Sequence, residues 1–314
     1  MKESERQVWI KEYEKLMFGE NHSKETIAIA ADMKYNHMPE LLFKYRSFSQ
    51  HSLEALRDDF LFSSQPKEFN DIFEGPIEIS HQKASENIHQ KNYNKMRLQN
   101  PYLLDRKVNS YRDLLESIAV SVGGSYEDFA QNYNDFPLMQ ELGKYVDRHI
   151  ENTICELQED ARNMYNICCF CAENDNEIMW AHYANQHTGF CIAYGIKELN
   201  NDLTHLTFPV IYTARCHLYI NDIDDINGSI CMYMLTIKSP DWSNEKEWRT
   251  FFLPNPPTYK EQMPKPKAVF LGARIAHNDE IQVSEICFKK GIPLYKMEMS
   301  LSQHRLIVKP YNSL

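Results

Sequence analysis

The stretch Cys168–Tyr194, CCFCAENDNEIMWAHYANQHTGFCIAY, decides the fold because it predicts two strands joined by a short helix. Ile167–Cys171 and Thr188–Tyr194 are apolar runs with the length and β propensity of buried strands. Between them, the triplet Asn174–Asn176 consists of capping residues, and Glu177–Asn185 contains no helix breaker. This pattern predicts an N-capped helix delivered between two core strands.

The predicted helix carries an aromatic and histidine-rich set of side chains. Met179, His182, Tyr183 and Gln186 share one face at helical spacing, and Trp180 lies on its flank. Such a helix either fills a packed corner or forms the wall of a site, and aromatic residues at this spacing favour the packed corner. If the helix forms a site, His182 is a candidate proton carrier, and Trp180 and Tyr183 offer faces on which a base can stack.

Length, composition and charge restrict the class of protein. The 314 residues suffice for one large domain or two modest ones, and 43% apolar with 12% aromatic residues is typical of a packed globular protein. No apolar run approaches a membrane span and the N-terminus is charged, which predicts a cytoplasmic protein. The net charge of −10 argues against an extended nucleic-acid-binding surface. The eight cysteines lie mostly within apolar, strand-like segments, so we expect buried reduced thiols and predict no metal site.

The rest of the chain alternates short strands and helices irregularly. Residues 1–40 form a predicted N-terminal helical extension, available for packing or for a protein partner. Residues 41–314 are predicted to form a single α+β domain with a mixed, largely antiparallel sheet. A helical insertion is expected at about residues 79–165, where apolar residues recur at helical spacing from Leu142 to Leu157.

Three polar residues stand out before the central stretch. Arg46 lies within a predicted strand, Leu41–Ser47, and is costly to bury unless it meets a carboxylate or an anionic ligand, because a guanidinium keeps its charge. Asn70 and Asp71 follow in a turn that their own side chains can fix, so they either serve only that turn or contribute to a site.

The segment Glu245–Leu253, EKEWRTFFL, is the second candidate for chemistry. We expect a strand from Glu247 onward, which would place Glu245, Glu247 and Arg249 on one face. This cluster forms either an internal salt bridge or an acid–base centre. Glu247 is preferred over His182 as the catalytic group, since Arg249 would keep it ionised and oriented.

Together these motifs resemble a bacterial and phage-borne family, domain of unknown function 2971. The motifs are Lys44-Tyr45-Arg46, Phe69-Asn70-Asp71, Met179-Trp180-x-His182-Tyr183 with Gly189, and Glu245-x-Glu247-Trp248-Arg249, in that order. The family has no settled activity, so the resemblance indicates fold and site location. The expected ligand-binding residues are Tyr45, Arg46, Asn70, Asp71, Trp180, Tyr183 and Arg249, and the expected catalytic residues are Glu247, His182 and Glu245.

A looser resemblance connects Arg46, Ser63-Ser64 and Glu245-x-Glu247 to ADP-ribosyltransferases. In those enzymes the arginine holds an NAD phosphate and the last glutamate orients the ribose. We therefore expect a nucleotide-directed enzyme, first an NAD-dependent toxin or defence protein, whose ligand is a small anionic nucleotide. The alternatives are a nuclease or phosphodiesterase that uses His182 with Glu247, and a non-catalytic nucleotide- or partner-binding module in phage defence.

Overall fold

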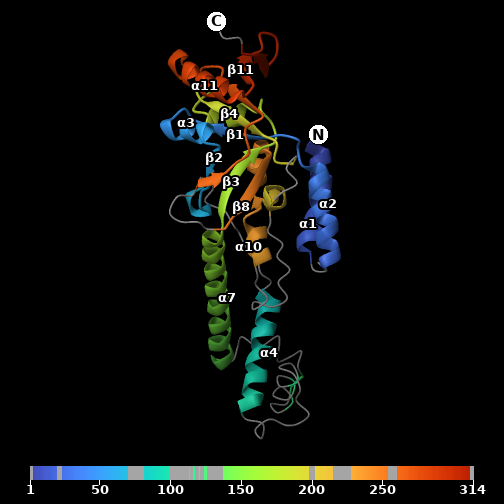
Figure 1. Cartoon of the computed structure of the whole chain (residues 1–314). Coiled ribbons are helices and arrows are strands. Elements are labelled where there is room, and N and C mark those ends of the chain that lie inside the picture. Colours follow the sequence, from blue (N-terminus) through green and yellow to red (C-terminus); the bar gives the residue numbers. More distant parts are fainter. Residues whose placement is uncertain are drawn as a thin grey trace. The chain divides into compact units, whose positions relative to one another are not determined.

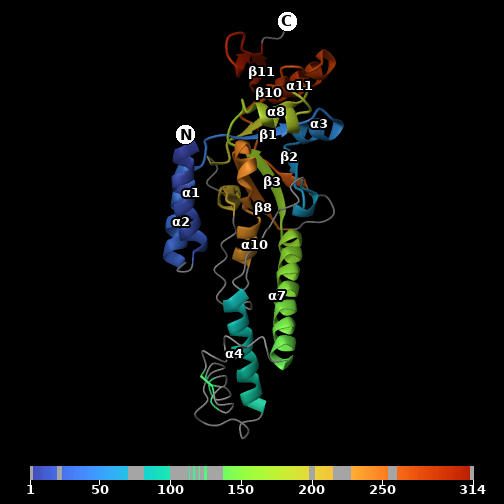
Figure 2. The same cartoon turned by 180° about the vertical axis from the view of Figure 1, so that it is seen from behind.

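The computed structural model describes residues 3–19, 23–69, 81–99, 137–197, 202–214, 228–253 and 260–311, with five isolated positions between residues 113 and 125. The chain divides into two compact units. The first unit consists of Met1–Pro76, Ala161–Cys216 and Cys231–Leu314, and the second consists of Ile77–Asp160 and His217–Ile230. Both units appear in Figures 1 and 2 and are described separately.

The first unit is built on an eight-stranded sheet with the order β12-β11-β10-β4-β1-β3-β8-β5. The paired strands are antiparallel except β10 and β11, which are parallel. The predicted α+β class with a mixed, largely antiparallel sheet is therefore confirmed. The strands are β1 (Leu42–Arg46), β3 (Asn166–Cys171), β4 (Phe190–Tyr194), β5 (Thr207–Pro209), β8 (Glu247–Phe252), β10 (Ala268–Leu271), β11 (Leu294–Met299) and β12 (Leu306–Pro310).

Two small sheets and several helices accompany this sheet. β2 (Phe60–Phe62) pairs with β9 (Lys260–Gln262), and β6 (Ile211–Tyr212) pairs with β7 (Ile237–Lys238). The helices of the first unit are α1 (Glu3–Phe18), α2 (Lys24–His37), α3 (Gln50–Arg57), η1 (Pro66–Glu68), α8 (Glu177–Tyr183), α9 (Asp202–Leu206), η5 (Pro240–Glu245) and α11 (His277–Lys290), and α10 (Gly228–Met234) ends in it.

The central stretch folds as predicted into strand, helix and strand, β3, α8 and β4. The Asn176 side chain caps α8 by accepting a hydrogen bond from the Met179 amide at 3.2 Å. The helix stops earlier than expected because Asn185, Gln186 and His187 have left-handed φ angles of 46°, 56° and 70°. These residues turn the chain back into β4.

Trp180 packs α8 into the protein core, as the packed-corner interpretation of this helix expects. Its side chain is fully buried, contacts the Tyr45 ring edge-on at 5.2 Å between ring centres, and donates its indole N–H to the Asn174 carbonyl at 2.7 Å. Because the whole ring is buried and its N–H group is satisfied internally, Trp180 anchors α8 to the sheet.

The predicted N-terminal helices are confirmed as α1 and α2, and both pack on the first unit. The Trp9 ring stacks on His37 at 4.5 Å and on Trp248 of β8 at 6.3 Å. The Lys34 ammonium donates to the carbonyls of Thr204 and His205 at 3.2 and 2.8 Å. Helices α1 and α2 are therefore integrated with the β5–β8 side of the sheet. The proposed role of residues 1–40 in binding a partner stays a prediction.

The second unit contains α4 (His81–Gln99) and most of α7 (Pro137–Met164). The apolar spacing that predicted a long amphipathic helix lies within α7, where Ile150 and Leu157 are buried. The unit starts close to the expected insertion, and it includes His217–Ile230, which the sequence did not indicate. None of the helices in the described part of the chain is long and apolar enough to cross a membrane.

Candidate functional site

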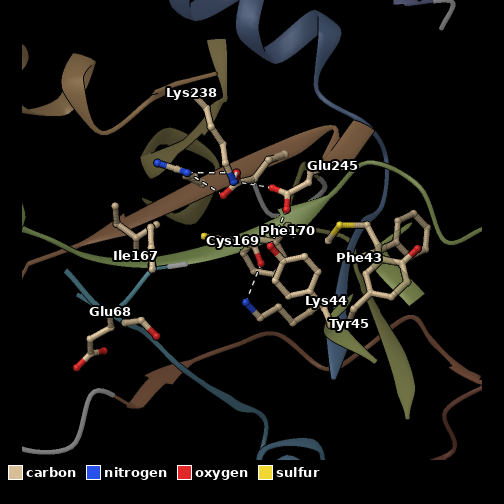
Figure 3. A pocket seen from close by; sticks show the side chains of 15 residues that line it. Phe43, Lys44, Tyr45, Glu68, Ile167, Cys169, Phe170, Lys238 and Glu245 are labelled. Atoms are coloured by element: carbon tan, nitrogen blue, oxygen red, sulfur yellow. Dashed lines mark hydrogen bonds and ion pairs between the residues drawn. The ribbon is translucent and has the colours of Figure 1, made fainter. Parts of the chain in front are cut away.

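A cavity of about 350 Å³ lies within the first unit, against β1, β3, β8 and α8 (Figure 3). Its wall combines aromatic rings with charged side chains, which is the composition expected of a ligand site. The lining residues are Phe43, Lys44, Tyr45, Ser64, Glu68, Phe69, Ile167, Cys169, Phe170, Met179, Tyr183, Lys238, Glu245, Glu247 and Arg249.

The cavity coincides with a split in the sheet between β1 and β3. These strands pair only at Phe43 and Cys171, whereas further along β3 Ile167 exchanges two backbone hydrogen bonds with Ser64, at 2.9 and 3.0 Å. Between these two points the Lys44 ammonium donates to the Cys169 carbonyl at 2.8 Å. A side-chain amine thus bonds to an edge of β3 that strand pairing leaves open.

Four charged side chains form a buried network at the β8 side of the cavity. Arg249 donates from Nε to Glu247 Oε1 at 2.8 Å and from Nη2 to Glu247 Oε2 at 3.2 Å. Lys238 Nζ lies 2.6 Å from Glu245 Oε2 and 3.2 Å from Glu247 Oε2. All four side chains are almost inaccessible to solvent, so these ion pairs are screened little by water.

The two carboxylates of this network differ in their acidity. Burial opposes ionisation of Glu247, but Arg249 and then Lys238 outweigh it and hold the pKa of Glu247 well below its usual range. Burial and the neighbouring Glu247 charge raise the pKa of Glu245, against the opposite effect of Lys238. The site therefore contains one firmly ionised carboxylate beside one that binds a proton more readily.

The backbone around Glu247 is fixed from a distant part of the sequence. Its amide donates to the Tyr212 hydroxyl at 2.9 Å, and its carbonyl accepts from Arg6 Nη2 at 3.4 Å. The Arg6 guanidinium also lies over the Tyr212 ring, 5.1 Å from its centre. Helix α1 thus contacts the backbone of Glu247, whose side chain is bound by Arg249.

Glu245 joins the network from a 3-10 helix and not from the strand face on which it was expected. The prediction of a strand from Glu247 onward is confirmed as β8, whereas Glu245 ends the 3-10 helix η5. Lys246, between the two glutamates, has a left-handed φ of 46°, which bends the chain and turns both carboxylates toward Lys238. The Tyr183 hydroxyl donates to Glu245 Oε1 at 2.6 Å and ties α8 to the network.

The structure brings five of the expected site residues to this cavity and leaves others elsewhere. His182 is exposed and Trp180 is in the core, and neither lines the cavity. Asn70 and Asp71 lie outside the described residues. The five residues at the cavity are Tyr45, Tyr183, Glu245, Glu247 and Arg249.

Arg46 does not line the cavity. Side chains alternate along a strand, and Tyr45 faces Trp180 of α8, so Arg46 and Lys44 both start from the opposite face of β1. Lys44 reaches the split through its bond to the Cys169 carbonyl, whereas Arg46 lies beside Cys168 and Tyr194. Burial lowers the pKa of Arg46, and its Nε and Nη2 atoms have no hydrogen-bond partner within the described chain. A ligand-binding role of Arg46 together with Glu247 stays a prediction.

Three lining residues with charged or thiol side chains, Lys44, Lys238 and Cys169, were not predicted as site residues. Lys44 is adjacent to Tyr45, Lys238 directly follows the apolar run Ile230–Ile237, and Cys169 is one of the cysteines expected as reduced thiols. Burial keeps the Cys169 thiol protonated by raising its pKa, and the thiol hydrogen-bonds Glu247. Of these three residues, only Lys238 could have been recognised from the sequence, because it is a charged residue at the end of an apolar run.

The fold and the cavity define an α+β protein with a buried acid–base network beside a ligand-sized pocket. Residues 179–250 match the model of a family described as a protein of unknown function (DUF2971), which confirms the family predicted from the motifs. The matched segment runs from α8 to β8 and includes Tyr183, Glu245, Glu247 and Arg249. No curated protein and no solved structure matches the chain significantly. No described group of three or more His, Cys, Asp or Glu residues could hold a metal ion.

Proposed function

We propose that the cavity is the active site of a nucleotide-directed transferase that uses NAD, in the manner of ADP-ribosyltransferases. The observation that carries the proposal is the pair Glu245 and Glu247, whose pKa values are displaced in opposite directions around the shared Lys238 ammonium. Two neighbouring carboxyl groups with separated pKa values are the arrangement that lets one act as a fixed anion and the other as a proton carrier.

The two carboxylates take different parts in this reaction. When the bond from ribose C1′ to the nicotinamide nitrogen breaks, nicotinamide leaves with the bonding electron pair and positive charge develops on the ribose. Glu247, held ionised by Arg249, stabilises that charge. Glu245 accepts the proton of the attacking oxygen or nitrogen, and its raised pKa suits a general base.

The remaining wall supports recognition of one nucleotide unit. Phe43, Tyr45, Phe69 and Phe170 line the cavity and offer aromatic surface to a base or a nicotinamide ring. A volume of about 350 Å³ lies at the lower end of the range for ligand pockets, which favours a mononucleotide-sized group in the cavity and the rest of a dinucleotide outside it.

The proposal is tested by incubating the purified protein with labelled NAD, alone and with cell extract. We expect nicotinamide release, and Glu247→Gln should reduce it by about 10²- to 10⁴-fold, as should Glu245→Gln. Glu298→Gln, at an exposed position of β11, is the matched control and should behave as the parent protein. Absence of NAD turnover under both conditions would overturn the proposal.

A second candidate is a nucleotide-binding module without turnover. The observation that favours it is the complete pairing of Glu247, whose two oxygens already accept from Arg249 and Lys238. A buried salt-bridge network of this kind can serve structure alone. Nucleotide binding that persists in Glu247→Gln, with no product in the parent protein, would support this candidate over the transferase.

A further inference from the structure

Lys44 places a positive charge in the cavity wall, and the described part of the chain gives it no carboxylate partner. Its Nζ atom donates to the Cys169 carbonyl at 2.8 Å and lies 5.8 Å from the centre of the Phe170 ring. Within the described residues, no carboxylate lies within ion-pair distance of it. An ammonium has three N–H donors, so the Cys169 carbonyl leaves two of them for a ligand.

The other charges of the cavity do not neutralise Lys44. Lys238 and Arg249 are matched by Glu245 and Glu247, which bind them directly. Glu68, the remaining acidic lining residue, is exposed, accepts from the Gln65 amide at 3.3 Å, and lies apart from the Lys44 amine in Figure 3. Among the residues that the structure describes, the Lys44 end of the cavity therefore has a local excess of positive charge.

Burying this charge is costly, and an anion would relieve the cost. Burial, with a smaller contribution from Arg46, outweighs the opposite effects of Cys169, Cys168 and Glu247 and lowers the pKa of Lys44. A phosphate oxygen against the two remaining N–H groups would offset this cost through charge-assisted hydrogen bonds. The split between β1 and β3 gives such a group access to both the amine and the open edge of β3.

We infer that Lys44 is the phosphate-binding residue of the cavity and that the substrate class is a nucleoside phosphate, not a free nucleoside. This inference rests on the proposed function, because it names the substrate class of the same site. Lys44 then replaces Arg46 as the cation that β1 supplies to the ligand, and the phosphate is held at the split while the ribose lies toward Glu247.

Binding measured without turnover tests the inference. AMP and adenosine carry no nicotinamide to release, so calorimetric titration of the parent protein with both isolates the phosphate, and AMP should bind about tenfold more tightly or better. Lys44→Gln keeps an N–H donor for the Cys169 carbonyl and removes the charge, so the preference for AMP should disappear. Lys44→Arg should restore part of it, and Lys309→Met, at an exposed position of β12, should leave it unchanged.

The outcomes separate the inference from the proposed function. A preference for AMP that survives in Lys44→Gln, or that is absent with intact Lys44, overturns the inference even if NAD is consumed. A Lys44-dependent preference in a protein that never consumes NAD supports the inference and removes the transferase. Thermal unfolding of each variant identifies any loss of binding that comes from misfolding, and Lys44→Arg then provides the folded comparison.

Discussion

At the scale of single residues, the site depends on how two cations are divided between two carboxylates. Glu247 binds both Arg249 and Lys238, whereas Glu245 binds Lys238 and the Tyr183 hydroxyl. The stronger positive surroundings of Glu247 explain why its proton is lost first. The same division makes each partner structurally important, because a buried charge without its counterion is costly.

Replacing Arg249 should therefore destabilise the protein strongly. Arg249→Met leaves the buried Glu247 with Lys238 alone and leaves the Leu235 carbonyl without the donor at 2.6 Å. We expect a loss of about 3–5 kcal/mol in the free energy of unfolding. Urea denaturation measures it, with Arg305→Met at an exposed position as the control. If the free energy of unfolding falls by less than about 1 kcal/mol, the Glu247–Arg249 pair contributes no more than a typical surface salt bridge.

The pH dependence of activity should report Glu245. As a general base it must be deprotonated, so kcat/KM should rise with pH through a pKa above the ordinary value for glutamate. The Tyr183 hydroxyl lowers the pKa of Glu245, and Tyr183→Phe should therefore move this rise to higher pH. Tyr45→Phe, whose hydroxyl instead donates to the Glu173 carbonyl, is the control. If the pH profile of kcat/KM is the same in Tyr183→Phe as in the parent protein, the ionisation that controls activity belongs to a group other than Glu245.

The same shifts act on stability with opposite signs. Because the folded-state pKa of Glu245 is raised, its contribution to stability is complete below its unfolded pKa and is lost as pH rises through the folded value. The folded-state pKa of Glu247 is lowered, so its contribution is present above its unfolded pKa and is lost as pH falls through the folded value. The stabilisation by the network therefore declines toward acid pH through Glu247 and toward higher pH through Glu245.

At the scale of elements, α1 acts on the site through the backbone of β8. Arg6 donates to the Glu247 carbonyl and covers the ring of Tyr212, which holds the Glu247 amide. Arg6→Met keeps most of the apolar stem and removes the donor, so we expect turnover of NAD to fall several-fold through misplacement of Glu247. Lys11→Met, at an exposed position of α1, should leave turnover unchanged. Equal rates for both variants would limit α1 to packing.

The close approach of the β1 backbone to the turn after α8 requires glycine at position 189. A Cβ atom at Gly189 would lie 2.0 Å from the Arg46 carbonyl oxygen, and backbone cannot withdraw as a flexible side chain can. Gly189→Ala should therefore shift β1 against β4 and destabilise the protein by at least about 1–3 kcal/mol. The melting temperature measures the effect. An unchanged value would show that the two strands separate without cost at this point.

At the scale of the whole molecule, the sequence predicts what neighbouring residues determine. Strands β3 and β4 and helix α8 follow from local propensity and capping. The Glu247–Arg249 pair was predicted because alternate residues of a strand share a face. The exchange of Arg46 for Lys44 was not predictable, because the split in the sheet depends on Ser64 pairing with Ile167 across a hundred residues of chain.

The charge of the whole protein should restrict the ligand to compact anions. The net charge of −10 opposes a long polyanion, while the Lys44 end of the cavity attracts a single phosphate-bearing group. Calorimetric titration at low salt, where non-specific binding to nucleic acid is strongest, should show binding of NAD and ATP and none of a short RNA. RNA binding that weakens steeply with added salt would contradict this prediction and reveal a basic surface. Each phosphate contact releases counterions, so the affinity for RNA falls more steeply with salt concentration as the number of contacts rises. The low-salt condition is chosen because it gives RNA its best opportunity to bind, so failure to bind there excludes a phosphate-backbone surface at any higher ionic strength.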